Sequence, residues 1–157
     1  MVIDDEFGPL GPGGTRALMT AIMGSGTGMK GGPYKLIRSI RIWRSNISDD
    51  GAAAIAEVLR LGGVDVQIQY LELLDNNIGP RGGLALGASL SQRHNLSLLT
   101  LKLDYNSTLG TDGVIELCKG LRTNATLKQV YSSPLLISYS SFSSELPLAP
   151  SQLLQYR

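Results

Sequence analysis

Apolar residues recur along this chain with a helical spacing that is tied to a glycine. Four stretches, at residues 10–22, 47–59, 78–90 and 109–121, share one order. In each, an apolar residue and three turn-forming residues precede a glycine, and two apolar residues four positions apart follow it. A spacing of four places both side chains on one helical face. The pattern therefore predicts four amphipathic helices and four structural glycines, which are Gly14, Gly51, Gly82 and Gly113.

A second pattern, with the period of a strand, precedes three of these glycines. Its apolar residues are Ile37, Ile40 and Ile42, then Ile68, Leu71 and Leu73, then Leu98, Leu101 and Leu103. The last two of each set alternate, as in a short strand with one buried face. Asn76 and Asn106 follow their strands at the same distance, and Ser45 takes that position in the first set. We expect the Asn76 amide to bond backbone groups of its own turn and of the adjacent unit, and Asn77 to be exposed.

Strand, turn and helix together make a repeat of roughly 30 residues. The glycines are 31 residues apart in the last two intervals and 37 in the first. We expect a repeat array over residues 1–132, with a partial unit at 1–24, a loop insertion at 24–35 and units that start near 37, 68, 98 and 127. Residues 133–157 form a divergent tail rich in Ser and Leu, for which disorder is one interpretation.

The combined pattern, L-x-x-L-x-L-x-x-N-x-I-x-x-x-G-x-x-x-L-x-x-x-L, resembles the leucine-rich repeat of the ribonuclease-inhibitor type. The resemblance covers residues 10–130 and extends to NOD-like receptors and Ran GTPase-activating proteins. It implies an α/β solenoid, a fragment of a horseshoe, with a parallel strand ribbon on the concave side and helices on the convex side. Such units bury their apolar faces only by stacking on one another.

The residues at the predicted turns agree with this arrangement. Pro12 and Pro80 fall in the first helical turn, where a missing N–H does no harm. Acidic residues lie near helix starts, where the helix dipole favours them, at Asp49, Asp50 and Asp112. The segment after Asn106 is one residue longer than its counterpart after Asn76, so we expect a local bulge there.

Composition and charge narrow the class of partner. The 157 residues carry a net charge of +1 and 43% hydrophobic residues, which argues against nucleic acid or a membrane surface as partner. The single cysteine allows no intrachain disulfide. No signal peptide or membrane-length apolar run is evident. We therefore expect a cytoplasmic location, with the nucleus also open.

Candidate catalytic and cofactor motifs are weak. The stretch "GTGMKG" at residues 26–31 matches G-x-G-x-x-G, but it would follow a helix and precede a strand, the reverse of a dinucleotide site. Cys118 and His94 fall in different layers of the predicted repeat, too far apart in its geometry for a nucleophile pair. No cluster of His, Cys and carboxylates suggests a metal. We expect no enzymatic activity, cofactor or metal.

Four triplets have the form of a glycan acceptor, at Asn46, Asn95, Asn106 and Asn124. The repeat itself generates such triplets, because one asparagine precedes each strand and another follows it. We expect these asparagines to serve the fold and not to carry glycans.

The side chains expected on the concave face are the main candidates for function. They are Ser39, Arg41, Trp43, Arg44, Tyr70, Glu72, Leu74, Asp75, Thr100, Lys102, Asp104, Tyr105, Gln129 and Tyr131. Aromatic and Arg side chains are typical interface anchors, and we expect Trp43 and the tyrosines among them to be exposed. An additional interpretation is that Arg41, Glu72 and Lys102 form a lateral charge ladder that supports the ribbon.

The two ends depart from the repeat. The first unit offers only Ile3 as a strand residue, and after Pro134 no helix or strand period continues. Neither end has a polar cap, which suggests a piece of a longer array or an end not native to the fold. The favoured function is a module that binds another protein through the concave face. The alternatives are a GTPase-activating regulatory scaffold and a structural array that self-associates through its ends.

Overall fold

The computed structural model describes all residues except 7, 25–31, 92–94, 96, 133–134 and 139–157. The strands are β1 (Val2–Ile3), β2 (Ser39–Trp43), β3 (Tyr70–Leu74), β4 (Thr100–Lys102), β5 (Gln129–Ser132) and β6 (Leu135–Ser138). The helices are α1 (Gly11–Met23), α2 (Ser48–Leu61), α3 (Pro80–Ser89), the short 3₁₀ helix η1 (Ser107–Leu109) and α4 (Gly110–Leu121).

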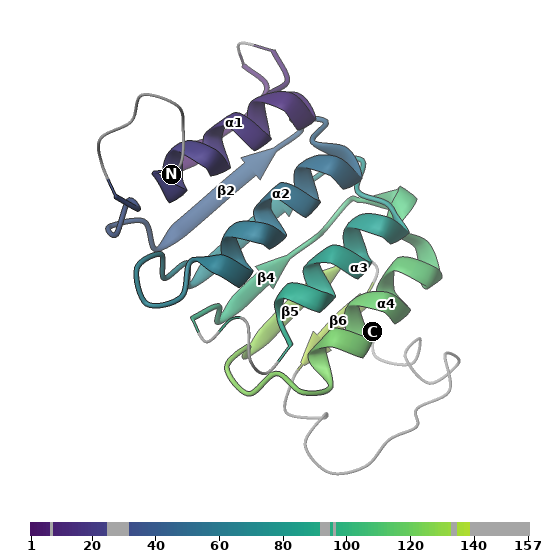
Figure 1. The fold of residues 1–157 in the computed structure, drawn as a ribbon. Helices are drawn as coiled ribbons and strands as arrows, with labels where there is room; N and C mark the ends of the chain where they lie inside the picture. The colour runs from purple at the N-terminus through teal and green to yellow at the C-terminus, as the bar shows by residue number, and fades with distance from the viewer. Residues whose placement is uncertain (7, 25–31, 92–94, 96, 133–134, 139–157) are drawn as a thin grey trace.

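The strands form a single sheet in the order of the chain, from β1 to β6. The pairs from β1 to β5 are parallel, and β6 runs antiparallel to β5. The four α-helices lie side by side on one face of this sheet (Figure 1). The expected α/β solenoid, with a strand ribbon on one side and helices on the other, is confirmed. We call the sheet face opposite the helices the uncovered face; it is the face predicted to be concave.

The core lies between the sheet and the helices, where the alternation of the strands predicts it. Ile40, Ile42, Leu71, Leu73, Leu101 and Leu103 are all 0% exposed. From the helices, Ile55, Leu59, Leu86, Leu90, Leu117 and Leu121 pack against them. The predicted pair Leu18 and Ile22 is less uniform, because Ile22 is buried whereas Leu18 is half-buried. Helix α1 is the first in the row, so it has a neighbouring helix on one side alone (Figure 1).

The helix starts carry the residues that the sequence places there. A proline occupies the first turn of α1 and of α3, and acidic residues occupy that of α2 and α4. The extra residue after Asn106 is taken up by η1, and the bulge expected there is a turn of 3₁₀ helix. Gly110 follows with φ of 55°, a left-handed conformation that glycine adopts without strain.

Two strands were not evident from the sequence pattern. Val2 and Ile3 align with Arg41 and Ile42, so the first unit contributes a strand of two residues to the ribbon. In the segment assigned to the tail, Leu135–Ser138 pairs with β5. Because that strand runs antiparallel, it does not continue the repeat and has no counterpart in the pattern of the earlier units.

Candidate functional site

The uncovered face is built by the residues that alternate with the buried strand positions. Register aligns them in rows that cross the strands. One row contains Arg41, Glu72, Lys102 and Tyr131. A second contains Ser39, Tyr70, Thr100 and Gln129, and Trp43 lies beside Leu74. The sequence thus predicted which side chains would share this face, and the register shows how they meet.

The middle of this face holds five side chains in contact, which we call the central cluster: Arg41, Tyr70, Glu72, Lys102 and Tyr131. The Tyr70 hydroxyl donates to Glu72 Oε2 at 2.7 Å, and Arg41 Nε lies 3.6 Å from the same oxygen. The Arg41 guanidinium carbon is 5.1 Å from the centre of the Tyr70 ring. The Lys102 ammonium lies 5.8 Å from the Tyr70 ring and 5.0 Å from the Tyr131 ring. These distances are those of cation–π contacts.

The cluster raises the pKa values of two of its members, Tyr70 and Lys102. Burial, and then the hydrogen bond to Glu72, raise the pKa of Tyr70 above the usual phenol value. The pKa of Lys102 is also raised, chiefly through its contact with the Tyr70 hydroxyl. Both shifts extend to higher pH the range in which Tyr70 is a neutral donor and Lys102 is a cation. The lateral ladder interpretation holds for Arg41 and Glu72, whose side chains are paired.

A further row lies just beyond the ends of the strands and consists of Arg44, Asp75 and Tyr105. All three have positive φ, at 47°, 52° and 61°, which turns the chain from strand to helix in each unit. Arg44 Nε pairs with Asp5 Oδ1 at 3.1 Å. Tyr105 is 68% exposed. This left-handed conformation is costly for residues with a Cβ, and all three side chains are exposed.

The expectation that Trp43 is exposed is wrong: the side chain is half-buried, and its Nε1 is buried without a hydrogen-bond partner in the described part of the chain. Its neighbour across the sheet is Leu74. Tyr70 and Tyr131 are also half-buried, because cationic side chains lie over their rings. Of the four aromatic residues placed on this face, Trp43, Tyr70, Tyr105 and Tyr131, Tyr105 is the one in the exposed class, at 68%.

The asparagines that follow the strands are buried and bridge neighbouring units. Asn76 Nδ2 donates to the carbonyls of Ile42 and Leu74, at 2.7 and 2.9 Å, and its Oδ1 accepts from the Ser45 N–H at 3.0 Å. Asn106 Nδ2 donates to Leu73 and Leu103, and its Oδ1 accepts from the Asn76 N–H. Each amide therefore joins its own turn to the preceding unit.

A second pair of asparagines precedes the strands. Asn95 Nδ2 donates to the Leu59 carbonyl and Asn124 Nδ2 donates to the Leu90 carbonyl, which are carbonyls at the end of the preceding unit's helix. Asn95, Asn106 and Asn124 are 3%, 6% and 4% exposed. A glycan cannot be accommodated on an amide that is buried and bonded in this way. Asn46, the fourth triplet, is exposed.

The four predicted structural glycines share one contact. A Cβ on Gly14, Gly51, Gly82 or Gly113 would meet the apolar side chain four residues earlier, at 2.5–2.7 Å. Those partners are Leu10, Ile47, Ile78 and Leu109. The glycine in each unit therefore leaves room for the apolar residue that closes the start of the helix.

Asp49 has a specific partner in the structure, whereas the sequence indicates only that it is an acidic residue near a helix start. Asp49 Oδ1 accepts the N–H groups of Gly79 and Gly82, at 2.7 and 2.8 Å. These groups belong to the start of α3, so Asp49 caps the helix of the next unit and not its own. The repeat offset of about 30 residues was the signal that could have indicated this contact.

The other candidate motifs carry no site in the described residues. "GTGMKG" and His94 lie outside them, so the nucleotide-loop and Cys118–His94 hypotheses are not addressed by the structure. In the described ranges, no group of three His, Cys or carboxylate side chains could hold a metal ion. The same ranges contain no helix of sufficient length and apolar character to span a bilayer.

Cys118 is half-buried on α4, and burial raises the pKa of its thiol. A raised pKa leaves less of the reactive thiolate at a given pH. We expect Cys118 to react with Ellman's reagent at pH 8 several-fold more slowly in the folded protein than in guanidinium chloride. Because the chain has one cysteine, the absorbance reports this thiol alone. Equal rates in the two conditions would show that the thiol is accessible in the fold.

Comparison with known protein families agrees with the geometry. The family model described as leucine-rich repeat matches residues 68–87 and 94–118. No curated protein shows significant similarity to the chain. The chain is a leucine-rich repeat protein, with the repeat pattern, the parallel ribbon and the asparagine contacts all following from one recurring unit.

Proposed function

We propose that this array binds another protein through the uncovered face of its sheet. Leucine-rich repeat domains generally mediate protein–protein interaction. The observation that carries the finer proposal is the central cluster, because it places two tyrosine rings and two cations together on the sheet face opposite the described helices. Tyrosine and arginine are enriched in interface anchors.

The residues proposed for partner binding either alternate with the buried positions of the strands or follow the strand ends. They are Arg41, Trp43, Arg44, Tyr70, Glu72, Leu74, Asp75, Lys102, Asp104, Tyr105 and Tyr131. Three of them are cations and three are anions. This balance favours a protein surface of mixed charge over a polyanion such as nucleic acid.

Photo-crosslinking tests whether a partner binds to the uncovered face. Benzoylphenylalanine at Tyr105 or Tyr131 should yield a crosslinked partner from a cell lysate, and the yield should fall when Lys102→Glu is added. The matched control is the same probe at Ala53, which is exposed on α2, on the opposite side of the molecule. Crosslinks from Ala53 alone would place the partner on the helices and contradict the proposal.

The alternative functions predict different measurements. A GTPase-activating scaffold would accelerate nucleotide hydrolysis by a small GTPase, and a self-stacking array would scatter more light than a monomer as its concentration rises. For a binding module we expect neither effect. The ribonuclease-inhibitor subtype is also part of our proposal, and it is supported by the α-helices of 10 to 14 residues in the units.

A further inference from the structure

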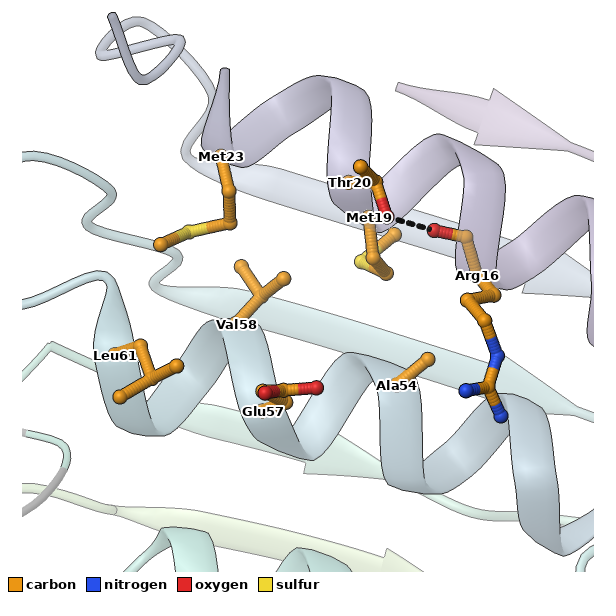
Figure 2. A pocket seen from close by; sticks show the side chains of 8 residues that line it. All are labelled: Arg16, Met19, Thr20, Met23, Ala54, Glu57, Val58 and Leu61. Atoms are coloured by element: carbon orange, nitrogen blue, oxygen red, sulfur yellow. Dashed lines mark hydrogen bonds between the residues drawn. The ribbon is translucent and has the colours of Figure 1, made fainter. Parts of the chain in front are cut away.

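A hollow of about 340 Å³ lies between α1 and α2 on the helical side of the molecule. Figure 2 shows its two walls, with Met19 and Met23 from α1 facing Val58 and Leu61 from α2. Arg16 lies at the end nearer the helix N-termini, and Met23 and Leu61 lie at the end nearer the C-termini. We call this hollow the α1–α2 groove. Its volume is at the lower limit of known ligand pockets.

The groove exists because α1 and α2 meet differently from the later helices. On α3 and α4, glycines bring the backbones into contact, since a Cβ on Gly83 would lie 2.5 Å from the Gly113 carbonyl oxygen. Between α1 and α2 the corresponding glycine contact is with a side chain, since a Cβ on Gly51 would lie 3.3 Å from Thr15 Oγ1. Beyond it, larger side chains replace glycine on both helices and a hollow remains between them.

Apolar surface continues past the groove at the C-terminal ends of both helices. Leu61 is 51% exposed, Val64 is 84% exposed and Tyr34 is 54% exposed. Tyr34 is held there by its N–H, which donates to the Ile22 carbonyl at 2.7 Å, and an ion pair between Lys35 and Asp65 joins the two loops at 2.8 Å. An apolar surface that extends beyond the hollow suits a polypeptide better than a small molecule.

The groove has one acidic and one basic side chain, which lie at different positions along its length. Arg16 and Glu57 line it, and neither has an ion-pair partner in the described part of the chain. Glu57 lies nearer the C-terminal end than Arg16 (Figure 2). That end also has the negative pole of α1, whose last turn has no basic residue; the last turn of α2 contains Arg60, which does not line the groove. Among the charged side chains that line the groove, the negative one, Glu57, thus lies toward the helix C-termini and the positive one, Arg16, lies toward the N-termini.

We propose that the α1–α2 groove docks one amphipathic helix of a partner protein, antiparallel to α1 and α2. Its N-terminal basic residue lies at Glu57, a large apolar side chain fills the hollow between Met19 and Leu61, and an acidic residue nearer its C-terminus lies at Arg16. Two parallel helices form the walls, and a helix laid between them presents its apolar residues at i and i+4. The methionines suit an anchor of variable shape.

The probe is a stapled, fluorescein-labelled peptide of about 15 residues, with Lys near its N-terminus, Leu at i and i+4 in the middle, and Glu near its C-terminus. Two matched peptides carry either Lys and Glu exchanged or both Leu replaced by Ala. Binding is measured by fluorescence anisotropy. The methyl signals of Met19 and Met23, in protein labelled with ¹³C-methionine, report the place of binding.

We expect the first peptide to bind about threefold to tenfold more tightly than its charge-exchanged form, and the Ala peptide to bind still more weakly. The double variant Arg16→Glu, Glu57→Lys should invert the charge preference. Ala54→Trp, which fills the groove, should abolish binding, whereas Ala53→Trp on the exposed side of α2 should not. Circular dichroism of each variant checks its fold.

Several outcomes would overturn the proposal. They are absence of saturable binding, equal affinity for the two charge arrangements, and binding without shifts at Met19 and Met23. If sedimentation shows a dimer that Leu61→Asp dissociates, the occupant is a second copy of this chain and the partner-helix proposal is wrong. Lys102→Glu on the uncovered face should leave the affinity of the groove for the peptide unchanged. The peptide test is therefore independent of the crosslinking test of the uncovered face.

Discussion

Replacement of Gly120 by alanine is expected to lower the free energy of unfolding by about 3 kcal/mol. A Cβ at this position would overlap the backbone of Gly87, and a Cβ on Gly87 would lie 2.7 Å from the Glu116 carbonyl oxygen. Both contacts are between backbones of α3 and α4, so no flexible side chain can move aside. The helices must separate, and the loss of packing outweighs the gain of about 1 kcal/mol in helix propensity.

Urea unfolding followed by circular dichroism measures this effect. Gly13→Ala in α1 is the matched control, because it is also helical and has nothing within 4 Å of a built Cβ. We expect that control to be neutral or to stabilise the fold by up to about 1 kcal/mol. If Gly120→Ala unfolds at the same urea concentration as Gly13→Ala, the close approach of α3 and α4 is not required.

Replacement of Asn76 by alanine is expected to cost about 2–4 kcal/mol. Asn76 is 0% exposed, and its loss would leave the Ile42 and Leu74 carbonyls and the Ser45 N–H without their side-chain partner. A buried polar group that loses its partner costs about 1–3 kcal/mol.

The control for this variant must be compatible with the left-handed backbone conformation at the substituted position. Asn77 is exposed and has φ of 56°, so Asn77→Gly retains an allowed conformation and should leave stability nearly unchanged. Asn77→Ala should cost about 1 kcal/mol for its left-handed backbone alone. Thermal and urea unfolding would both show the order. An Asn76→Ala protein as stable as Asn77→Gly would contradict the role of the Asn76 amide.

The sequence was informative where a contact recurs inside one unit. The alternation of Leu71 and Leu73 predicted a strand with one buried face, and the spacing of Leu86 and Leu90 predicted a helix face against it. The structural position of Gly82 was also evident, since its contact with Ile78 lies within one helical turn. These features depend on local geometry, which a repeat makes visible several times in one chain.

Contacts between units were less predictable. Asp49 caps the next helix, and its own position in α2 suggested no such partner. Gly87 and Gly120 fall outside the aligned glycine position, yet they decide how closely α3 and α4 pack. Trp43 was expected to be exposed because its position alternates with buried residues, but it is half-buried, with Leu74 beside it on the neighbouring strand. Such contacts depend on how far each unit is shifted against the next.

Position 45 holds serine where the next two units hold asparagine, and this difference affects how the array unfolds. Asn76 and Asn106 each fasten their unit to the preceding one, whereas the Ser45 hydroxyl donates to the Trp43 carbonyl in its own turn. Because serine is shorter, the junction between the first two units lacks the side-chain hydrogen bond that joins the units at the next two junctions. In a one-dimensional array, cooperativity depends on the coupling at each junction. Amide hydrogen exchange should therefore be graded along the ribbon, fastest in β1 and α1, so that the first unit opens while the middle units remain closed.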